Sequence, residues 1–256
     1  MQPALFIGHG SPMNTLLDNS FTQAWRRLAQ ETPRPKAIVA ISAHWFIPET
    51  AVTVATQPRT IHDFSGFPPE LHLVRYPAAG DPALARRLRD MLAPVPVRLD
   101  EQWGLDHGTW SVLAQLYPQA DIPVVQLSLD RTQPPVFQLD LGRRLAPLRD
   151  EGVLILGSGN IVHNLRAYAW DRPGRPDYDW AARFESAVRQ RILAGDDAAL
   201  ADYGALAPDA ALSVPTPEHY LPLLTVLGAR RAWDAVAFPV EGVDGGSISM
   251  LAVQIG

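Results

Sequence analysis

The chain of 256 residues contains no cysteine. This absence excludes disulfide bonds, thiolate metal sites and cysteine nucleophiles from any account of its function. Any bound metal ion must therefore be held by nitrogen and oxygen ligands. Histidine, aspartate and glutamate are the residues that could supply them.

Lysine is also scarce, since Lys36 is the only one, and the formal net charge is −5. Without a block of lysines and arginines, the chain lacks the electrostatic surface that nucleic-acid binding requires. No apolar run approaches the roughly 18 residues that cross a membrane, and the N-terminus has no basic segment typical of a signal peptide. We therefore expect a cytoplasmic protein that binds neither nucleic acid nor membrane.

Apolar side chains are plentiful, since hydrophobic residues make up 47% of the chain and charged residues only 19%. Short apolar runs bounded by Gly, Pro and Ser alternate with longer amphipathic stretches. This alternation is typical of an α/β sheet that carries helices on both faces. Because no repeat, low-complexity segment or linker interrupts it, residues 1–256 are expected to form a single domain.

The expected elements follow from the periodicity of the apolar residues. The expected strands are Ala4–Ile7, Ala37–Ser42, Ala51–Ala55, Ile122–Leu129, Val153–Leu156, Ala235–Phe238 and Ser247–Val253. The expected helices are Phe21–Gln30, Pro82–Leu92, Thr109–Tyr117, Val136–Leu148, Tyr178–Leu193, Asp197–Tyr203 and Glu218–Leu227. Two stretches, Gln57–Gly80 and Trp170–Asp177, read as irregular loops, and the first is rich enough in aromatic residues to face a substrate.

Three of the seven histidines follow expected strands: His9, His44 and His163. In open α/β sheets, ligands bind beyond the carboxyl ends of the strands, so these three side chains could converge on one cleft. Glycines close to His9 and His163 would allow the backbone to bend tightly and approach a ligand. A single histidine after a strand is more often a turn residue than a ligand, and both interpretations stay open for each residue taken alone.

The remaining histidines are less informative by position. His107 and His219 stand where a loop enters an expected helix, and His72 reads as a surface residue. The position of His62 favours neither a site residue nor a surface residue. Competing motifs are weak, because neither Gly8-His9-Gly10-Ser11 nor Gly157-Ser158-Gly159-Asn160 has the spacing of a dinucleotide fingerprint. The second is not a GxSxG nucleophile elbow either.

Six motifs, in this order, resemble those of the DOPA-type extradiol ring-opening dioxygenases, which belong to the class III extradiol superfamily. The resemblance runs from residue 5 to the closing Gly246-Ser247-Ile248-Ser249-Met250. It implies a three-layer α/β sandwich around a central, mostly parallel or mixed sheet. The motifs are Gly8-His9-Gly10-Ser11-Pro12-Met13, Ser42-Ala43-His44-Trp45, Ile61-His62-Asp63-Phe64, Leu105-Asp106-His107-Gly108-Thr109-Trp110, Gly157-Ser158-Gly159-Asn160-Ile161-Val162-His163-Asn164-Leu165 and Pro217-Glu218-His219-Tyr220-Leu221-Pro222.

The resemblance also implies roles for individual residues. It assigns His9, His44 and His219 to one divalent metal ion, either Zn²⁺ or Fe²⁺. It assigns His163 to acid–base catalysis, with His107 also in the pocket. The implied reaction inserts both atoms of O₂ into a catechol such as DOPA and gives a ring-opened semialdehyde. Substrate contacts are expected from His62, Phe64, Phe67 and Tyr220.

Several alternatives stay open at this level. Non-haem iron oxygenases typically combine two histidines with one carboxylate, so Glu218 competes with His219 as the third ligand. An all-histidine site also suits tetrahedral zinc, and His163 could then be a fourth ligand in a zinc-loaded resting state. A zinc-dependent hydrolase on the same scaffold is the alternative function. A metal-binding protein without catalytic activity is the third possible function. The oligomeric state also stays open, because a monomer and a homo-oligomer are both compatible with the sequence.

Overall fold

A twisted eight-stranded sheet forms the centre of the molecule. The computed structural model describes residues 1–170 and 177–256. The strand order is β4-β3-β5-β2-β6-β1-β10-β7, and β8 and β9 form a separate two-stranded sheet. The strands are β1 (Ala4–Gly8), β2 (Ala37–Ile47), β3 (Thr50–Thr53), β4 (Val97–Asp100), β5 (Val124–Asp130), β6 (Val153–Gly159), β7 (Val236–Val240), β8 (Val243–Asp244), β9 (Ile248–Ser249) and β10 (Ala252–Ile255).

The four central strands are parallel, and the sheet is mixed towards its edges. β1 pairs with β6, β6 with β2, and β2 with β5, all in parallel. β10 is antiparallel to β1, and β3 is antiparallel to β5. Parallel neighbours end at the same edge of a sheet, so the carboxyl ends of β1, β6 and β2 meet there. The prediction of a mostly parallel or mixed sheet is confirmed.

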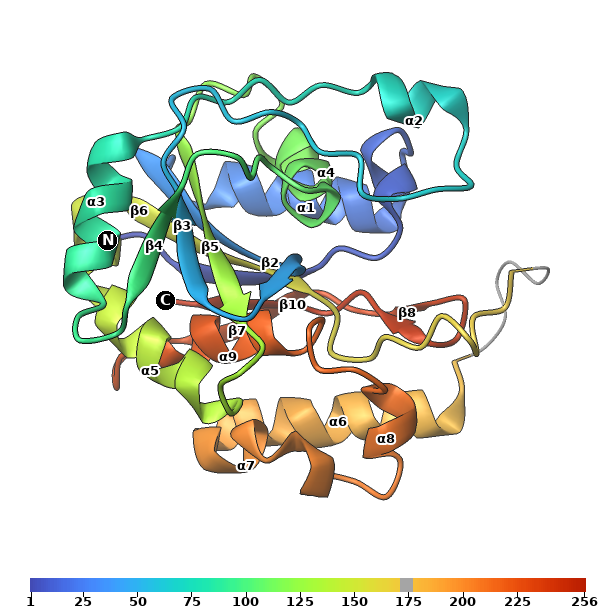
Figure 1. Ribbon diagram of the computed structural model, residues 1–256. Helices are drawn as coiled ribbons and strands as arrows, with labels where there is room; N and C mark the ends of the chain where they lie inside the picture. Colours follow the sequence, from blue (N-terminus) through green and yellow to red (C-terminus); the bar gives the residue numbers. More distant parts are fainter. Residues whose placement is uncertain (171–176) are drawn as a thin grey trace.

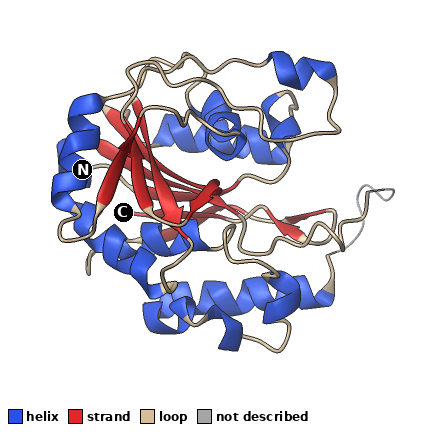
Figure 2. Cartoon of the chain, in the orientation of Figure 1, coloured by secondary structure: helices blue, strands red, loops and turns tan. Residues whose placement is uncertain are grey.

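Helices cover both faces of this sheet and complete three layers (Figures 1 and 2). In the view of Figure 1, α1, α2 and α4 lie above the sheet, and α5 to α9 lie below it. The α-helices are α1 (Ser20–Glu31), α2 (Pro69–Leu73), α3 (Pro82–Met91), α4 (His107–Leu116), α5 (Val136–Leu145), α6 (Asp179–Ala194), α7 (Asp197–Ala201), α8 (Ala210–Ser213) and α9 (Leu221–Gly228). Short 3-10 turns are η1 (Pro12–Thr15), η2 (Ala146–Glu151) and η3 (Tyr203–Ala205).

Two cores lie on opposite faces of the sheet because successive strand residues point to opposite sides. Within β1, Leu5 and Ile7 belong to the core that includes Trp25 of α1 and Trp110 of α4. Their neighbour Phe6 belongs to the other core, with residues of α5, α6 and α9. Both faces are fully buried, which explains why the central strands read as continuous apolar runs rather than as alternating ones.

Several element boundaries differ from the sequence-based expectation. β2 continues past Ser42 to Ile47, and α9 begins at Leu221 rather than at Glu218. The expected strand 247–253 is divided into β9 and β10. The loop Gln57–Gly80 contains the short helix α2, and the expectation for Trp170–Asp177 lies, except for its two ends, outside the described residues. No helix of the described residues is both long and apolar enough to cross a membrane.

Candidate metal centre and active site

A cavity of about 360 Å³ opens at the carboxyl edge of the central strands and is lined by five of the seven histidines. Its floor holds His9, His44, His107, His163 and His219. The other lining residues are Gly10, Ser11, Pro12, Asp63, Phe64, Ser65, Phe67, Leu165, Tyr168, Trp170, Asp244 and Ile248. The five histidines come from segments far apart in the sequence, and the sheet brings them together.

His9 is the first residue after β1, and its ring orientation is fixed by Ser158 of the neighbouring strand β6. Nδ1 of His9 lies 3.0 Å from Ser158 Oγ, whose own hydrogen is donated to the carbonyl oxygen of Gly108 at 2.5 Å. Ser158 Oγ must therefore accept, so His9 carries its proton on Nδ1. The lone pair of Nε2 is left free for a ligand.

His44 lies in the carboxyl-terminal half of β2, where a bulge interrupts the pairing with β5 between Ile41 and Phe46. Bulges of this kind redirect side chains at functional sites. Its Nδ1 lies 3.2 Å from Asp63 Oδ2. Since a carboxylate can only accept, Nδ1 carries the proton and Nε2 again faces the centre of the cavity. Gly108 permits this position, because a Cβ there would lie 2.8 Å from Cδ2 of His44.

His219 precedes α9 and is held by its neighbour in the chain and by β6. Its Nδ1 lies 3.2 Å from Glu218 Oε1, which also accepts from the Thr216 hydroxyl at 2.7 Å. Glu218 is absent from the cavity lining, so its carboxylate orients His219 from the outer side. Gly159 is essential here, because a Cβ at that position would lie 2.1 Å from the carbonyl oxygen of His219.

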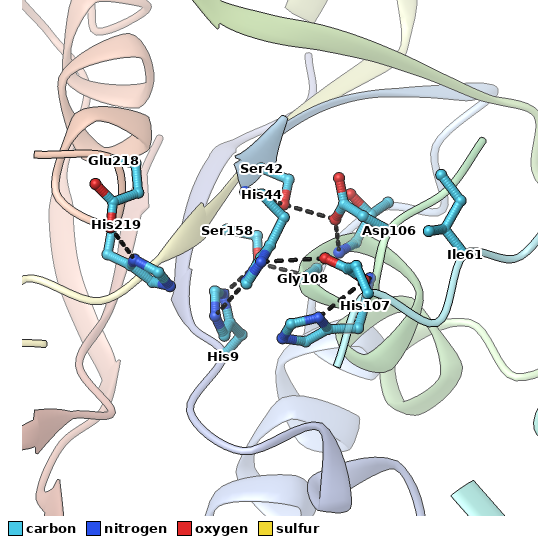
Figure 3. A network of polar contacts seen from close by, with 12 residues as sticks. His9, Ser42, His44, Ile61, Asp106, His107, Gly108, Ser158, Glu218 and His219 are labelled. Atoms are coloured by element: carbon cyan, nitrogen blue, oxygen red, sulfur yellow. Dashed lines mark hydrogen bonds and ion pairs between the residues drawn. The ribbon is translucent and has the colours of Figure 1, made fainter. Parts of the chain in front are cut away.

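The three rings of His9, His44 and His219 turn towards one another (Figure 3). The Nε2 atoms of His9 and His44 are 3.3 Å apart. With both Nδ1 atoms protonated, this contact requires either one extra proton between the two lone pairs or one cation. Two metal–imidazole bonds of 2.0–2.1 Å at a tetrahedral angle place their nitrogens about 3.3–3.4 Å apart. The donor set therefore fits a divalent metal ion.

His107 forms a second candidate triad with the first two histidines. Ligand atoms of His9, His44 and His107 all lie within 4.8 Å of one another, whereas His219 is outside this compact group. The ring centroid of His219 is 5.4 Å from that of His9 and 5.2 Å from that of His44. Nδ1 of His107 lies 3.0 Å from Asp63 Oδ1 but at an angle that makes no hydrogen bond. That oxygen accepts the backbone N–H of His107 instead, at 2.9 Å.

The electrostatics of the cluster keep most of these rings neutral. Burial, reinforced by the charges of the neighbouring histidines, lowers the pKa of His9 and of His219 well below the ordinary value. For His44, burial acts in the same direction but is outweighed by the carboxylates of Asp63, Asp106 and Glu218, so that its pKa is raised. Burial would raise the pKa of Asp63, yet His107 and His44 hold it far below its usual range. Neutral imidazoles beside an anionic carboxylate are the protonation states that metal binding requires.

His163 occupies the cavity but not the position of a further ligand to the same ion as His219. Its ring stacks on that of His219, with centroids 3.5 Å apart and planes 6° from parallel. The lone pair of an imidazole nitrogen lies in the ring plane, so two stacked, parallel rings cannot both point at one ion. Burial lowers the pKa of His163 to about 4. The ring is therefore neutral at physiological pH, with a free lone pair on one nitrogen.

The residues expected to contact a substrate divide into two groups. Phe64 and Phe67 line the cavity, with ring centroids 5.4 Å apart. His62 does not line it: its Nε2 faces the carbonyl oxygen of Val74 at 3.0 Å, and its ring is edge-on to that of Phe64, with centroids 5.8 Å apart. The expectation for Tyr220 is wrong: its side chain is fully buried and its hydroxyl donates to the carbonyl oxygen of Leu200 at 3.0 Å. The ring points into the core beneath the sheet, away from the cavity.

Several residues of the site were not identified from the sequence. Asp63 and Ser158 orient the histidines, and both stand inside motifs that were singled out for other residues. Tyr168, Trp170 and Asp244 line the outer part of the cavity. Nothing in their spacing signals this, because they reach the cavity through the fold of the chain around β8 and β9.

Comparison with known proteins agrees with this geometry. Residues 4–245 match the family described as the catalytic LigB subunit of aromatic ring-opening dioxygenase. The chain belongs to this family. A 4,5-DOPA dioxygenase extradiol of Escherichia coli (strain K12) is 52% identical over 99% of this chain and 94% of that protein. The 4,5-DOPA dioxygenase extradiol of Beta vulgaris is 38% identical over 97% of this chain and 94% of its own length.

A solved structure extends the comparison to the fold of this LigB-family chain. The crystal structure of an uncharacterized protein from Escherichia coli K12 superimposes with a TM-score of 0.88 at 47% sequence identity and covers 100% of both chains. The LigB-family chain is thus a metal-dependent, ring-opening dioxygenase of the extradiol class that cleaves catechols, and its cavity contains the histidine cluster that this chemistry needs. The comparisons give the hydrolase alternative no support.

Removing the hydroxyl that orients His9 tests whether these outer contacts matter to the dioxygenase. In Ser158→Ala, Nδ1 of His9 loses its acceptor, so neither the tautomer nor the ring orientation is fixed. We expect metal affinity to fall about 10–100-fold, the usual cost of an outer contact of a metal ligand. Competition with a metallochromic chelator measures this, and unchanged affinity would contradict the role given to Ser158.

Proposed function

We propose that this chain opens the ring of a catechol such as DOPA beside its two hydroxyls, by inserting both atoms of O₂, to give a ring-opened semialdehyde. One observation carries the proposal. The Nε2 atoms of His9 and His44 lie 3.3 Å apart, and His107 and His219 stand beside them in a cavity lined in part by aromatic and apolar side chains, in a chain of the LigB family. Its relatives from Escherichia coli and Beta vulgaris are named 4,5-DOPA dioxygenase extradiol, which supports DOPA as the substrate.

His9, His44 and His219 are the proposed ligands of one Fe²⁺ or Zn²⁺ ion. All three share one arrangement, in which Nδ1 contacts Ser158, Asp63 or Glu218 and Nε2 is left for the ion. His107 differs in that the Asp63 oxygen beside its Nδ1 already accepts the backbone N–H of His107 itself. When bound, Fe²⁺ would supply both the Lewis acidity and the electron transfer that ring opening by O₂ requires, whereas Zn²⁺, which has no redox chemistry, would supply only the Lewis acidity.

His163 is the proposed acid–base group, which takes a proton from a catechol hydroxyl and later returns it. Its ring lies in the cavity beside His219 and is neutral, so it can accept that proton. The stacked arrangement argues against the alternative of a fourth ligand, for the geometric reason given above. His107 is proposed to lie beside the substrate, where its ring contacts both His44 and Phe64.

Reconstitution with metal tests the reaction as a whole. We expect apoprotein loaded with Fe²⁺ under anaerobic conditions to consume O₂ when air and a catechol are added, with the appearance of a coloured semialdehyde. Zn²⁺-loaded protein, measured in parallel, determines which ion supports turnover. An oxygen electrode and the visible spectrum provide the readout. No O₂ uptake with either ion, across a panel of catechols that includes DOPA, would contradict the proposed function.

The loop that carries Phe64 and Phe67 is proposed to cover the substrate. Both ends of the loop are anchored, since Ile61 donates its N–H to Leu105 at 2.7 Å and the buried Tyr76 donates its hydroxyl to Tyr117 at 2.9 Å. The intervening tip is the part that remains free to respond to a ligand. We expect a catechol analogue to slow amide hydrogen exchange at residues 64–68 but not at 76–80. Exchange that is unchanged at the tip would mean that the two rings serve only core packing.

A further inference from the structure

The outer wall of the cavity is built by one row of residues that starts at His163. The backbone of His163 bridges to Ile248, and Ile248 is directly opposite Asp244 in the pairing of β8 with β9. Residues that are directly opposite point to the same face, and neighbouring strands lie about 4.7–4.9 Å apart. Asp244 is therefore two strand spacings, roughly 10 Å, from His163 and faces the same cavity.

Two aromatic rings stand beside Asp244. The Tyr168 hydroxyl donates to Asp244 Oδ2 at 2.9 Å, and the rings of Tyr168 and Trp170 are 4.5 Å apart. Gly245 makes room for this arrangement, because a Cβ there would lie 2.2 Å from Cε2 of Tyr168. A carboxylate in the same cavity wall as two electron-rich rings can bind an organic ammonium ion, since the carboxylate supplies a charge pair and the rings supply cation–π attraction.

The charges around the cavity also favour a cationic ligand. Among the described residues, no lysine or arginine lines it, and its two carboxylates are Asp63 and Asp244. Asp63 is already engaged by His44 and His107, so it does not serve the outer part of the cavity. Burial, followed by the charge of Asp244, raises the pKa of Tyr168 to about 12, which keeps its hydroxyl a donor to that carboxylate. Within the described part of the chain, the second oxygen of Asp244 has no hydrogen-bond partner and can accept from a ligand.

We propose that Asp244, with the rings of Tyr168 and Trp170, binds an ammonium group on the side chain of the substrate. This inference rests on the proposed function for the position of the catechol ring. With the hydroxyls beside His163 and the metal ligands, an aminoethyl arm extends its nitrogen along the row towards Asp244. The preferred substrates are then catechols with an amine-bearing arm, including amino-acid arms, over catechols whose arm carries only a carboxylate.

Binding of two phenols of nearly equal shape to the metal-loaded protein tests the proposal without turnover. Tyramine carries the ammonium group, and 4-ethylphenol lacks it. We expect wild type to bind tyramine about tenfold more tightly, because a charge-assisted hydrogen bond contributes roughly that factor. In Asp244→Asn this preference should disappear, while the affinity for 4-ethylphenol stays unchanged. Titration calorimetry measures both affinities.

A matched control removes one negative charge elsewhere. Asp209 pairs with Arg183 at 2.7 Å, outside the cavity, so Asp209→Asn changes net charge equally and should keep the tyramine preference. Equal affinities in wild type, or a preference that survives Asp244→Asn, would overturn the proposal. Because tyramine is not a catechol, a protein that binds it through Asp244 yet opens no ring would refute the dioxygenase reaction while supporting the ammonium site.

A second readout uses turnover of paired catechols. For 4-(2-aminoethyl)catechol, Asp244→Asn should lower kcat/KM about tenfold, mainly through KM, since the ammonium lies away from the reacting bond. For 3-(3,4-dihydroxyphenyl)propionate, the same change removes a repulsion and should raise kcat/KM. A parallel loss with both substrates would mean that Asp244 serves the structure of the hairpin rather than recognition, and would overturn the proposal.

Discussion

Replacing His163 with glutamine is expected to reduce turnover by about 10²–10⁴-fold, the usual range for a lost proton-transfer group. Glutamine retains a polar side chain of similar reach but cannot take up a proton at neutral pH. Because His163 stacks on His219 rather than sharing an ion with it, metal content should stay at the wild-type level. Steady-state O₂ uptake and metal analysis of the same preparation measure the two quantities together.

Substrate binding separates this interpretation from a structural one. His163→Gln should still bind a catechol, so that KM or the dissociation constant changes little while kcat falls. Metal loss comparable to that in His9→Ala would instead make His163 a ligand. Activity restored in His163→Ala by added imidazole would be further support for proton transfer, since the small base can enter the space that the ring has vacated.

Alanine at His9 or at His44 is expected to lower metal affinity by more than about 100-fold, beyond the loss expected for an outer contact. Both residues belong to either candidate triad, and their Nε2 atoms are the two that lie 3.3 Å apart. Removing one leaves the ion with too few nitrogens. Metal content after dialysis against a weak chelator, measured for each variant, gives the result; full occupancy in both variants would contradict the site.

Two matched variants, His219→Ala and His107→Ala, distinguish which of these histidines is the third metal ligand. If His219 completes the set, His219→Ala should lose metal as His9→Ala does, while His107→Ala should keep it and lose activity. The reverse pattern would assign the ion to His9, His44 and His107. Glu218→Gln is a useful control, because a carboxylate that only orients His219 should cost about 10–100-fold in affinity rather than the whole site.

The sequence predicted the class of the fold because local signals agree with it. The central strands are continuous apolar runs, and helices α1, α3 and α4 begin with clear caps at Asn19, Asp81 and Asp106. β4 was missed because it is a four-residue edge strand that follows a proline-rich turn and is only partly buried. The sequence predicts too early an end for β2, at Ser42, because the apolar run stops at this polar residue, whereas the strand continues through a bulge to Ile47.

The candidate site was predictable only where residues sit in contiguous motifs. The positions of His9, His44 and His163 after strands indicated convergence, since parallel strands end at a common edge. The sequence does not predict the direction of each side chain. Tyr220 follows His219 directly, yet its side chain is buried in the core beneath the sheet and not in the cavity. Asp244 and Tyr168 are 76 positions apart and meet only through the β8–β9 hairpin, so no local pattern could link them.

The contacts of Gly159 make metal binding depend on the folded state. Gly159 accepts the backbone N–H of His9 at 3.0 Å on one side and touches the His219 carbonyl on the other, so residues 9 and 219 become neighbours only when β6 is in place. In the unfolded chain their nitrogens are dispersed, and the ion has almost no affinity for that state. Each tenfold rise in free metal above the dissociation constant should therefore add about 1.4 kcal/mol to the free energy of unfolding.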